Sequence, residues 1–191
     1  MTALAISTDS TRIVTGDALG RISMWNLTTG KLVETKTESS AAITAVVFTP
    51  DGSGIISAVR DEIRRWEIAN QKKYPALAAQ KDKTFTSLAL SVDGRFLAAG
   101  DRAGTLYVWD VRKWEKVWEC AAHTQGISAL WLSANGDTLA TASLDFTMKL
   151  WDVNKKTILK TFGAHEGHRR KVTAVAFTPN AKEVITADED G

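Results

Sequence analysis

Three histidines are the residues in this sequence whose type best suits chemistry at neutral pH. An imidazole can bind a metal ion or act as a general base because its ordinary pKa is about 6.5. We considered both roles for His123 and His168. The sequence contains no nucleophile elbow, phosphate-binding loop or paired-cysteine zinc motif that would complete such a site. It therefore predicts a protein that is not an enzyme and that holds no metal and no cofactor.

Two other patterns resemble ligand-binding loops. Two glycine pairs could be mistaken for phosphate-binding loops: Gly16 with Gly20, and Gly100 with Gly104. They stand at the same place in two copies of a repeated pattern, so we interpret them as turns between strands. The final four residues, Asp-Glu-Asp-Gly, resemble the opening of a calcium loop. The corresponding turn of the preceding repeat contains Asp145, so a turn is favoured here as well.

Four tryptophans recur at intervals of 41, 43 and 42 residues: Trp25, Trp66, Trp109 and Trp151. A period of about 40 residues is typical of repeat proteins, in which each unit buries its apolar faces against its neighbours. The elements that position the polar residues must therefore be copies of one building block.

Each repeat begins with a short apolar segment of the kind that forms a strand. These segments are Ala3–Ser7, Ile43–Thr49, Phe85–Ser91, Ile127–Ser133 and Val172–Thr178. Three of them are followed by a dipeptide that tolerates positive φ angles: Asp51-Gly52, Asp93-Gly94 and Asn135-Gly136. Such turns favour antiparallel hairpins, so we expect the first two strands of each repeat to pair.

The pattern resembles the WD-repeat family of β-propellers, and the resemblance covers essentially the whole chain. Trp109-Asp110 and Trp151-Asp152 give the family's dipeptide in full. The resemblance implies an all-β propeller in which each blade is a four-stranded antiparallel sheet with strands a to d, the Trp ending strand c. The expected blades are residues 3–36, 43–78, 85–120, 127–162 and an incomplete fifth at 172–191.

The family's hydrogen-bonded tetrad of Trp, Ser, Asp and His is complete in one blade of this sequence. Blade 4 has Trp151, Ser143, Asp145 and His123 at the four positions. The resemblance implies that the buried indole N–H donates to the Ser143 hydroxyl, with His and Asp completing the chain of hydrogen bonds. This assignment favours a structural role for His123 over a metal or base role.

The other blades depart from the tetrad. The Asp position holds Leu19, Arg60 and Ala103 in blades 1, 2 and 3, and the His position holds Ser39 and Lys81 in blades 2 and 3. Blade 5 retains His168 and Asp190, with Asp188 in place of Ser. We expect the blades without the tetrad to hold their turns in another way.

Composition sets broad limits on the function. The chain has 191 residues, 44% of them hydrophobic, and a formal net charge of +2 with acids and bases interleaved. There is no basic stripe of the kind that attracts phosphate backbones, so nucleic acid is not implied. No apolar run approaches the length of a membrane span. The single cysteine, Cys120, suits a reducing compartment, which favours the cytoplasm.

Propellers usually close a ring of about four to eight blades, whereas this sequence carries four and a half. An unpartnered end blade exposes on the order of 500 Å² of apolar surface, which corresponds to roughly 12 kcal/mol. That is comparable to the whole stability of a typical domain, about 5 to 15 kcal/mol. We therefore expect a fragment of a larger ring of about seven blades or more. The alternative is closure by self-association.

Three tryptophans and one arginine fall outside the periodic set. Trp131, on strand a, either crowds the central channel or fills a gap between blades, and we favour packing. We expect Trp118, within strand d of blade 3, to have a core or inter-blade role, and Trp114, in a c-to-d turn, to be a contact candidate. Arg65 replaces the apolar residue that precedes the Trp in the other repeats, and we expect its head group to reach solvent.

The resemblance implies a non-catalytic scaffold that binds a protein or peptide through its rim loops. The alternative is a regulatory propeller region of a larger enzyme whose catalytic domain lies outside this chain. In the family, contacts often come from the top face, in the loop before strand a and just before the tetrad Asp. The corresponding residues are Asp82, Thr84, Arg102, Thr124, Leu144, Arg169, Lys171 and Glu189.

Overall fold

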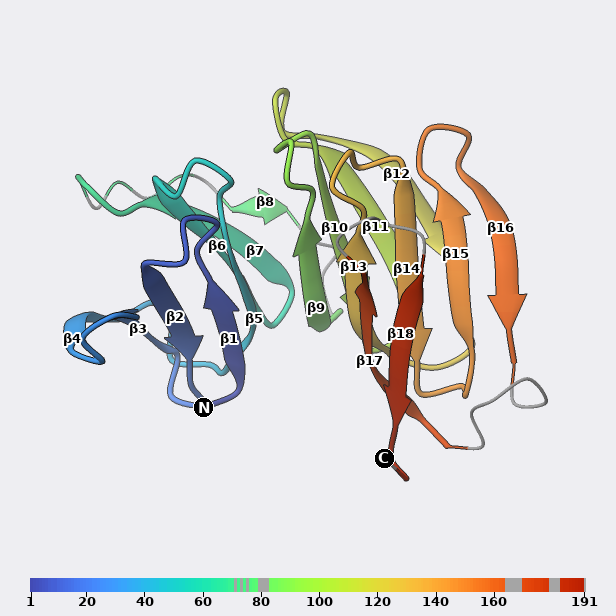
Figure 1. The fold of residues 1–191 in the computed structure, drawn as a ribbon, viewed down its shortest axis with the longest axis horizontal. Coiled ribbons are helices and arrows are strands. Elements are labelled where there is room, and N and C mark those ends of the chain that lie inside the picture. Colours follow the sequence, from blue (N-terminus) through green and yellow to red (C-terminus); the bar gives the residue numbers. More distant parts are fainter. Residues whose placement is uncertain are drawn as a thin grey trace. The chain divides into compact units, whose positions relative to one another are not determined.

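The structure is a computed structural model, and it describes residues 1–70, 72, 74, 76–78, 83–163, 170–178 and 183–190. Every regular element in these ranges is a β-strand (Figure 1). The described ranges contain no helix that is long and apolar enough to cross a membrane. Four antiparallel sheets have four strands each and a fifth has two, which confirms the predicted all-β class and four-stranded sheets.

The strands follow the chain in order within each sheet. Blade 1 consists of β1 (Ala3–Ile6), β2 (Arg12–Gly16), β3 (Arg21–Asn26) and β4 (Leu32–Thr37). Blade 2 consists of β5 (Ile43–Phe48), β6 (Gly54–Val59), β7 (Glu62–Glu67) and β8 (Leu77–Ala78). Blade 3 consists of β9 (Phe85–Leu90), β10 (Phe96–Asp101), β11 (Thr105–Asp110) and β12 (Glu115–Ala121).

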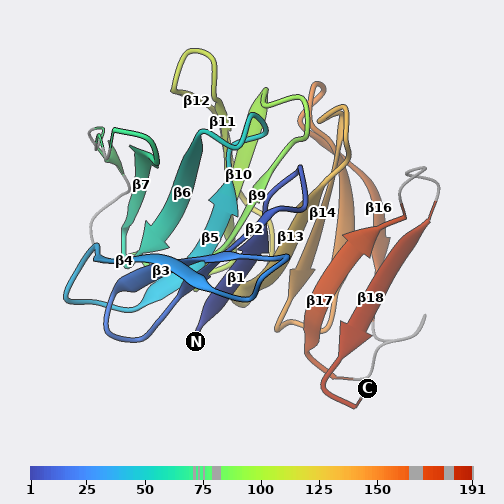
Figure 2. The same cartoon turned by 60° about the vertical axis from the view of Figure 1, so that its left-hand side comes forward.

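Blade 4 consists of β13 (Ile127–Leu132), β14 (Thr138–Ser143), β15 (Met148–Asp152) and β16 (Thr157–Phe162). The fifth sheet is the hairpin of β17 (Val172–Phe177) and β18 (Val184–Asp188). β17 packs against β13 and β14 of blade 4 (Figure 2).

The a-to-b turns share one hydrogen-bonded design. The last residue before each turn is Ser or Thr, and its hydroxyl accepts the backbone N–H of the residue five positions later; in blade 4, Thr138 donates to Ser133 over 2.9 Å. The same bond recurs at Ser7, Thr49, Ser91 and Thr178. Gly52, Gly94 and Gly136 have φ angles of 66°, 69° and 72°. The positive φ angles expected at these turns are confirmed.

The chain divides into two compact units, Met1–Leu88 and Ala89–Gly191. In the first unit, Val14 and Ile22 of blade 1 form a core cluster with Ile55 and Trp66 of blade 2. In the second unit, the repeat tryptophan of blade 4, Trp151, is 4% exposed and joins a cluster drawn from blades 3 and 4. Each repeat tryptophan of these clusters thus packs against the preceding blade.

The tryptophans outside the period differ in their environments. Trp118 packs edge-on against Trp151 with ring centroids 5.3 Å apart, which confirms its packing role. Trp131 is 45% exposed, so the expectation that packing covers it is wrong. It stands at a strand a position where three of the other repeats have alanine: Ala5, Ala89 and Ala176. Trp114 is half-buried, and whether it contacts a partner stays a prediction.

The expectation for Arg65 is also wrong. Its side chain is half-buried, and its guanidinium lies 4.5 Å from the centre of the Tyr74 ring. A guanidinium is weakly hydrated and stacks readily on an aromatic face, so the residue stays against the protein instead of reaching solvent.

Blade 1 exposes apolar side chains on one face. Leu4 and Ile6 are 50% and 52% exposed, whereas Ala3 and Ala5, on the opposite face of β1, pack against the core cluster shared with blade 2. The covering of Leu4 and Ile6 by another blade stays a prediction.

Candidate functional site

The loop between blades 3 and 4 is built around one buried histidine. The His123 side chain is 0% exposed, and its Nδ1 lies 3.1 Å from Oδ2 of Asp145. Its Nε2 lies 2.7 Å from the hydroxyl of Thr141, and Thr147 lies 3.0 Å from Nδ1. Both ring nitrogens are therefore bonded to residues of blade 4, which ties the loop to that blade.

The tryptophan joins this network through a residue that the tetrad assignment did not contain. The indole Nε1 of Trp151 donates to Oγ1 of Thr141 over 3.0 Å, so the expected bond to Ser143 is wrong. Trp151 pairs with Leu139, and Thr141 lies two residues farther along β14 on the same face. Ser143 lies four residues from Leu139, at the end of the strand, beyond the reach of the indole.

Ser143 instead fastens the loop to the b-to-c turn. Its hydroxyl lies 3.0 Å from the carbonyl of Gly126, to which it donates, and accepts the backbone N–H of Asp145 over 3.1 Å. The four residues assigned from the sequence thus lie in one region, with Thr141 as the connecting member.

The hydrogen bonds assign the protonation state of the imidazole. Thr141 accepts from Trp151, so its hydroxyl hydrogen is available to Nε2 of His123, and Nδ1 then carries the proton donated to Asp145. Burial lowers the pKa of His123, and this outweighs the opposing attraction of the Asp145 carboxylate. The neutral imidazole is therefore the form that stabilises the fold.

The carboxylate of Asp145 is held ionised. Burial alone would raise its pKa, but hydrogen bonds from the Thr147 hydroxyl and the Thr124 backbone N–H outweigh burial, and the pKa lies below its ordinary value. With its side chain only 8% exposed, Asp145 supports the loop and does not face solvent as a base.

A glycine allows the loop to pass close to the preceding turn. Gly104 has a φ of +87°, and a Cβ there would lie 2.3 Å from the carbonyl oxygen of His123. The Gly104 carbonyl accepts the backbone N–H groups of Ala122 and His123 at 3.0 Å each. Only glycine fits such a close backbone approach at positive φ.

Three of the expected top-face residues have backbone atoms that lie against Asp145 or Gly126. Thr124 donates its backbone N–H to Asp145 over 3.0 Å, and Leu144 donates its own to the Gly126 carbonyl over 3.0 Å. A Cβ on Gly126 would lie 3.0 Å from the carbonyl oxygen of Arg102. We call the surface formed by Arg102, Thr124 and Leu144 the Arg102 surface.

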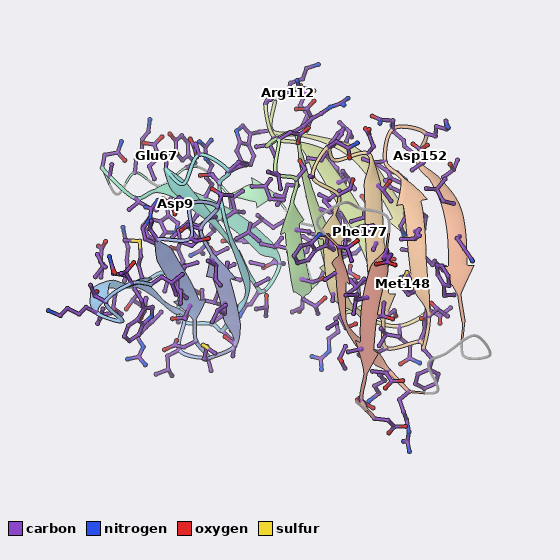
Figure 3. The ribbon with its side chains drawn as sticks, viewed as in Figure 1. Asp9, Glu67, Arg112, Met148, Asp152 and Phe177 are labelled. Carbon is purple, nitrogen blue, oxygen red and sulfur yellow. The ribbon has the colours of Figure 1, made fainter. Side chains whose placement is uncertain are left out.

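Figure 3 labels the two ends of strand β15 in blade 4. Met148 marks the end of β15 that follows the b-to-c turn, and Asp152 marks the opposite end of the same strand. Arg112, in the c-to-d turn of blade 3, also lies toward the Asp152 end of the second unit.

The other expected contact residues are placed differently. Lys171 and Glu189 pair with each other, with Nζ and Oε1 3.5 Å apart. Thr84 belongs to the first unit, where it precedes Phe85. Asp82 and Arg169 lie outside the described residues, and so do His165, His168 and Lys81.

Two aspartates that the tetrad assignment missed hold the b-to-c turns of blades 1 and 3. Asp17 accepts the backbone N–H groups of Leu19 and Arg21. Asp101 is fully buried and accepts those of Ala103 and Thr105 at 2.9 and 2.7 Å. Both stand where blade 4 has Ser143. The recurring Gly-Asp-x-x-Gly pattern at 16–20 and 100–104 was the sequence signal that identifies them.

The described residues contain no group of three or more His, Cys, Asp or Glu arranged to hold a metal ion. The aspartates of the calcium-like segment make local contacts: Asp188 accepts the backbone N–H of Asp190, and Asp190 pairs with Arg170. The final glycine of that segment is outside the described ranges.

Comparison with known families gives an independent assignment. A family model described as WD domain, G-beta repeat matches residues 75–110, 114–152 and 156–191, more than half of the chain. The chain belongs to the WD-repeat family. The resemblance and the fold class predicted from the sequence are thereby confirmed.

Several curated proteins are similar to this WD-repeat chain. Periodic tryptophan protein 2 of Arabidopsis thaliana is 28% identical over 188 residues, covering 97% of this chain and 20% of the relative. Small ribosomal subunit protein RACK1y of Oryza sativa subsp. japonica is 32% identical over 115 residues, covering 57% and 34%. U3 small nucleolar RNA-interacting protein 2 of Homo sapiens is 28% identical over 100 residues, covering 47% and 21%. This chain therefore matches at most about a third of each relative.

Removing the Thr141 hydroxyl should destabilise the second unit. Thr141→Val keeps the shape but leaves the buried Trp151 N–H and His123 Nε2 without their partner, so we expect a loss of about 2–3 kcal/mol in the free energy of unfolding. Thr15→Val is the matched control, because it removes the same indole bond, at 3.2 Å, to the half-buried Trp25 of blade 1. It should cost below about 1 kcal/mol. Equal losses in urea denaturation would contradict the network.

Acid should weaken the contribution of His123. Its folded-state pKa lies below the ordinary 6.5, so the unfolded chain takes up a proton first as the pH falls. The contribution is complete above about pH 6.5 and is lost as the pH falls through the folded-state pKa. The free energy of unfolding of wild type should therefore exceed that of His123→Gln by an amount that decreases as the pH falls from about 8 to about 5. The other histidines are present in both proteins, so their contributions to the pH dependence cancel. A stability difference that does not change with pH would contradict the prediction.

Proposed function

We propose that this WD-repeat chain is a non-catalytic scaffold that binds a protein or peptide through the Arg102 surface. The observation that carries the proposal is that the backbones of three residues, from two turns and the loop between them, meet at Gly126 and Asp145. WD-repeat proteins generally serve as interaction scaffolds, and the support described above fixes the backbone beneath these three residues.

The chemistry of the Arg102 surface suits a peptide segment. Arg102 is exposed and offers a fork of N–H donors to carboxylate or carbonyl oxygens. Leu144 is half-buried and offers apolar area, and Thr124 is exposed with a hydroxyl. Arginine is enriched among residues that dominate binding energy, and a backbone held in place loses little conformational entropy on binding.

The buried polar groups argue for support and against catalysis. His123 and Asp145 are the residue types used in acid–base chemistry, but their side chains are 0% and 8% exposed and each is bonded within the network. A general base must reach the proton that it removes, and neither group faces solvent. We therefore assign them to holding the surface.

The kind of assembly and the compartment are part of the proposal. One relative is named as a ribosomal subunit protein and another as interacting with U3 small nucleolar RNA. We propose a protein partner, because the chain has a formal charge of only +2. The expected cytoplasmic location is kept as a proposal, with the nucleolus as the alternative that the second name suggests.

Reversing the charge of Arg102 should reduce partner binding. We expect Arg102→Glu to lower recovery of cross-linked partner proteins from cells about tenfold, the effect of losing roughly 1.4 kcal/mol of binding energy. Arg112→Glu is the control, since Arg112 is exposed in the same unit but lies toward the opposite end of the blades. Quantitative mass spectrometry of the recovered proteins gives the readout.

Two results would reject the proposed surface or partner. Equal recovery with Arg102→Glu and wild type, or an equal loss with Arg112→Glu, would reject the Arg102 surface. Loss of all recovered proteins after RNase treatment would identify RNA as the molecule that is bound. Each variant should have the same thermal unfolding temperature as wild type, which checks that the fold is kept.

A further inference from the structure

The loop between blades 1 and 2 repeats the backbone of the loop between blades 3 and 4. The Gly20 carbonyl accepts the N–H groups of Glu38 and Ser39, as Gly104 does for Ala122 and His123. A Cβ on Gly20 would lie 2.1 Å from the Ser39 carbonyl, a clash equivalent to the one at Gly104. Ser39 therefore occupies the place of His123, and Glu38 that of Ala122.

Blade 2 keeps the tryptophan and the hydroxyl residue of the network. Trp66 pairs with Ile55, and Ser57 lies two residues farther along β6, as Thr141 does on β14. The blade lacks the imidazole, since Ser39 stands in its place and its hydroxyl accepts the nearby N–H of Ala41 over 3.0 Å. It also lacks the aspartate, because Arg60 stands where blade 4 has Asp145.

Three buried polar atoms of blade 2 and the loop before it have no hydrogen-bond partner among the residues that the structure describes. They are Nε1 of Trp66, Oγ of Ser57 and Oε2 of Glu38, and each has under 1 Å² of accessible surface. Leaving one such group unsatisfied costs about 1–3 kcal/mol. One group that both donates and accepts can satisfy all three; in blade 4, Thr141 bonds both Trp151 and the His123 imidazole.

Glu38 occupies a position that faces the apolar core in the equivalent loop. Its counterpart Ala122 belongs to the cluster that contains Trp151. The carboxylate is 2% exposed, and Arg64 is held nearby, with Nη1 3.8 Å from Oε1 and 2.6 Å from the Glu38 carbonyl oxygen. Oε1 is the carboxylate oxygen that pairs with Arg64, and Oε2 is the oxygen that no described residue bonds.

We propose that one water molecule binds between blades 1 and 2 in the place that the His123 imidazole takes between blades 3 and 4. The water accepts from Trp66 Nε1, donates to Glu38 Oε2 and takes Ser57 Oγ as its third partner. Buried waters typically make about three hydrogen bonds to polar groups that otherwise lack partners. Water carries both donors and acceptors, which an indole N–H and a carboxylate together require.

The test is water–protein cross-relaxation measured by NMR at the indole protons of the whole chain. The Trp66 indole proton should show a cross-peak with a long-lived water, and Trp151, bonded to Thr141, should show none in the same sample. Absence of the Trp66 cross-peak in wild type would overturn the proposal.

Two variants separate the water from other sources of the signal. In Ser57→Ala the cross-peak should remain, because the water keeps Trp66 and Glu38; its loss would show that the signal came through the Ser57 hydroxyl and would overturn the proposal. In Ser39→His an imidazole should displace the water and remove the cross-peak. A persistent cross-peak in that folded variant would reject the assigned position.

Discussion

A buried imidazole with both ring nitrogens bonded to protein groups constrains the loop between blades 3 and 4. His123 has no contact with solvent, so each ring nitrogen needs a partner within the protein, and Thr141 and Asp145 supply them from blade 4. The loop that carries His123 is bonded to blade 3 through Gly104. One side chain therefore links two blades, and the Arg102 surface rests on that link.

The periodic features of the fold could be predicted from the sequence because they depend on local patterns. The spacing of the tryptophans and the Asp-Gly and Asn-Gly turns indicated the strands and hairpins that the structure contains. The network was only partly predictable. Its members were found, but the link through Thr141 depends on register across two strands, which a motif does not encode.

The hydroxyl residues that the tetrad assignment missed could have been found from their spacing in the sequence. A hydroxyl residue stands nine or ten positions before the repeat tryptophan in three blades, at Thr15, Ser57 and Thr141, whereas blade 3 has Ala99. The stacking of Arg65 on Tyr74 had no such signal, because the contact crosses between strand c and the segment that follows it. Contacts of this kind follow from packing and not from periodicity.

The blades of this WD-repeat chain solve one problem in different ways. A b-to-c turn needs acceptors for its backbone N–H groups, and Asp17 and Asp101 supply carboxylates where blade 4 combines Ser143 with Asp145. The turn is kept while the side chains change, because any short acceptor at that position satisfies the same donors. Blades with different rim residues can therefore share one backbone.

The most direct measurement of the central claim is backbone hydrogen exchange in wild type and His123→Ala. If the imidazole holds the Arg102 surface, the amides of Thr124 and Leu144 should exchange faster in the variant, since their acceptors are Asp145 and Gly126. The amide of Glu38, in the equivalent loop of the first unit, should exchange at the same rate in both proteins. Unchanged exchange at Thr124 and Leu144 in the folded variant would contradict the account.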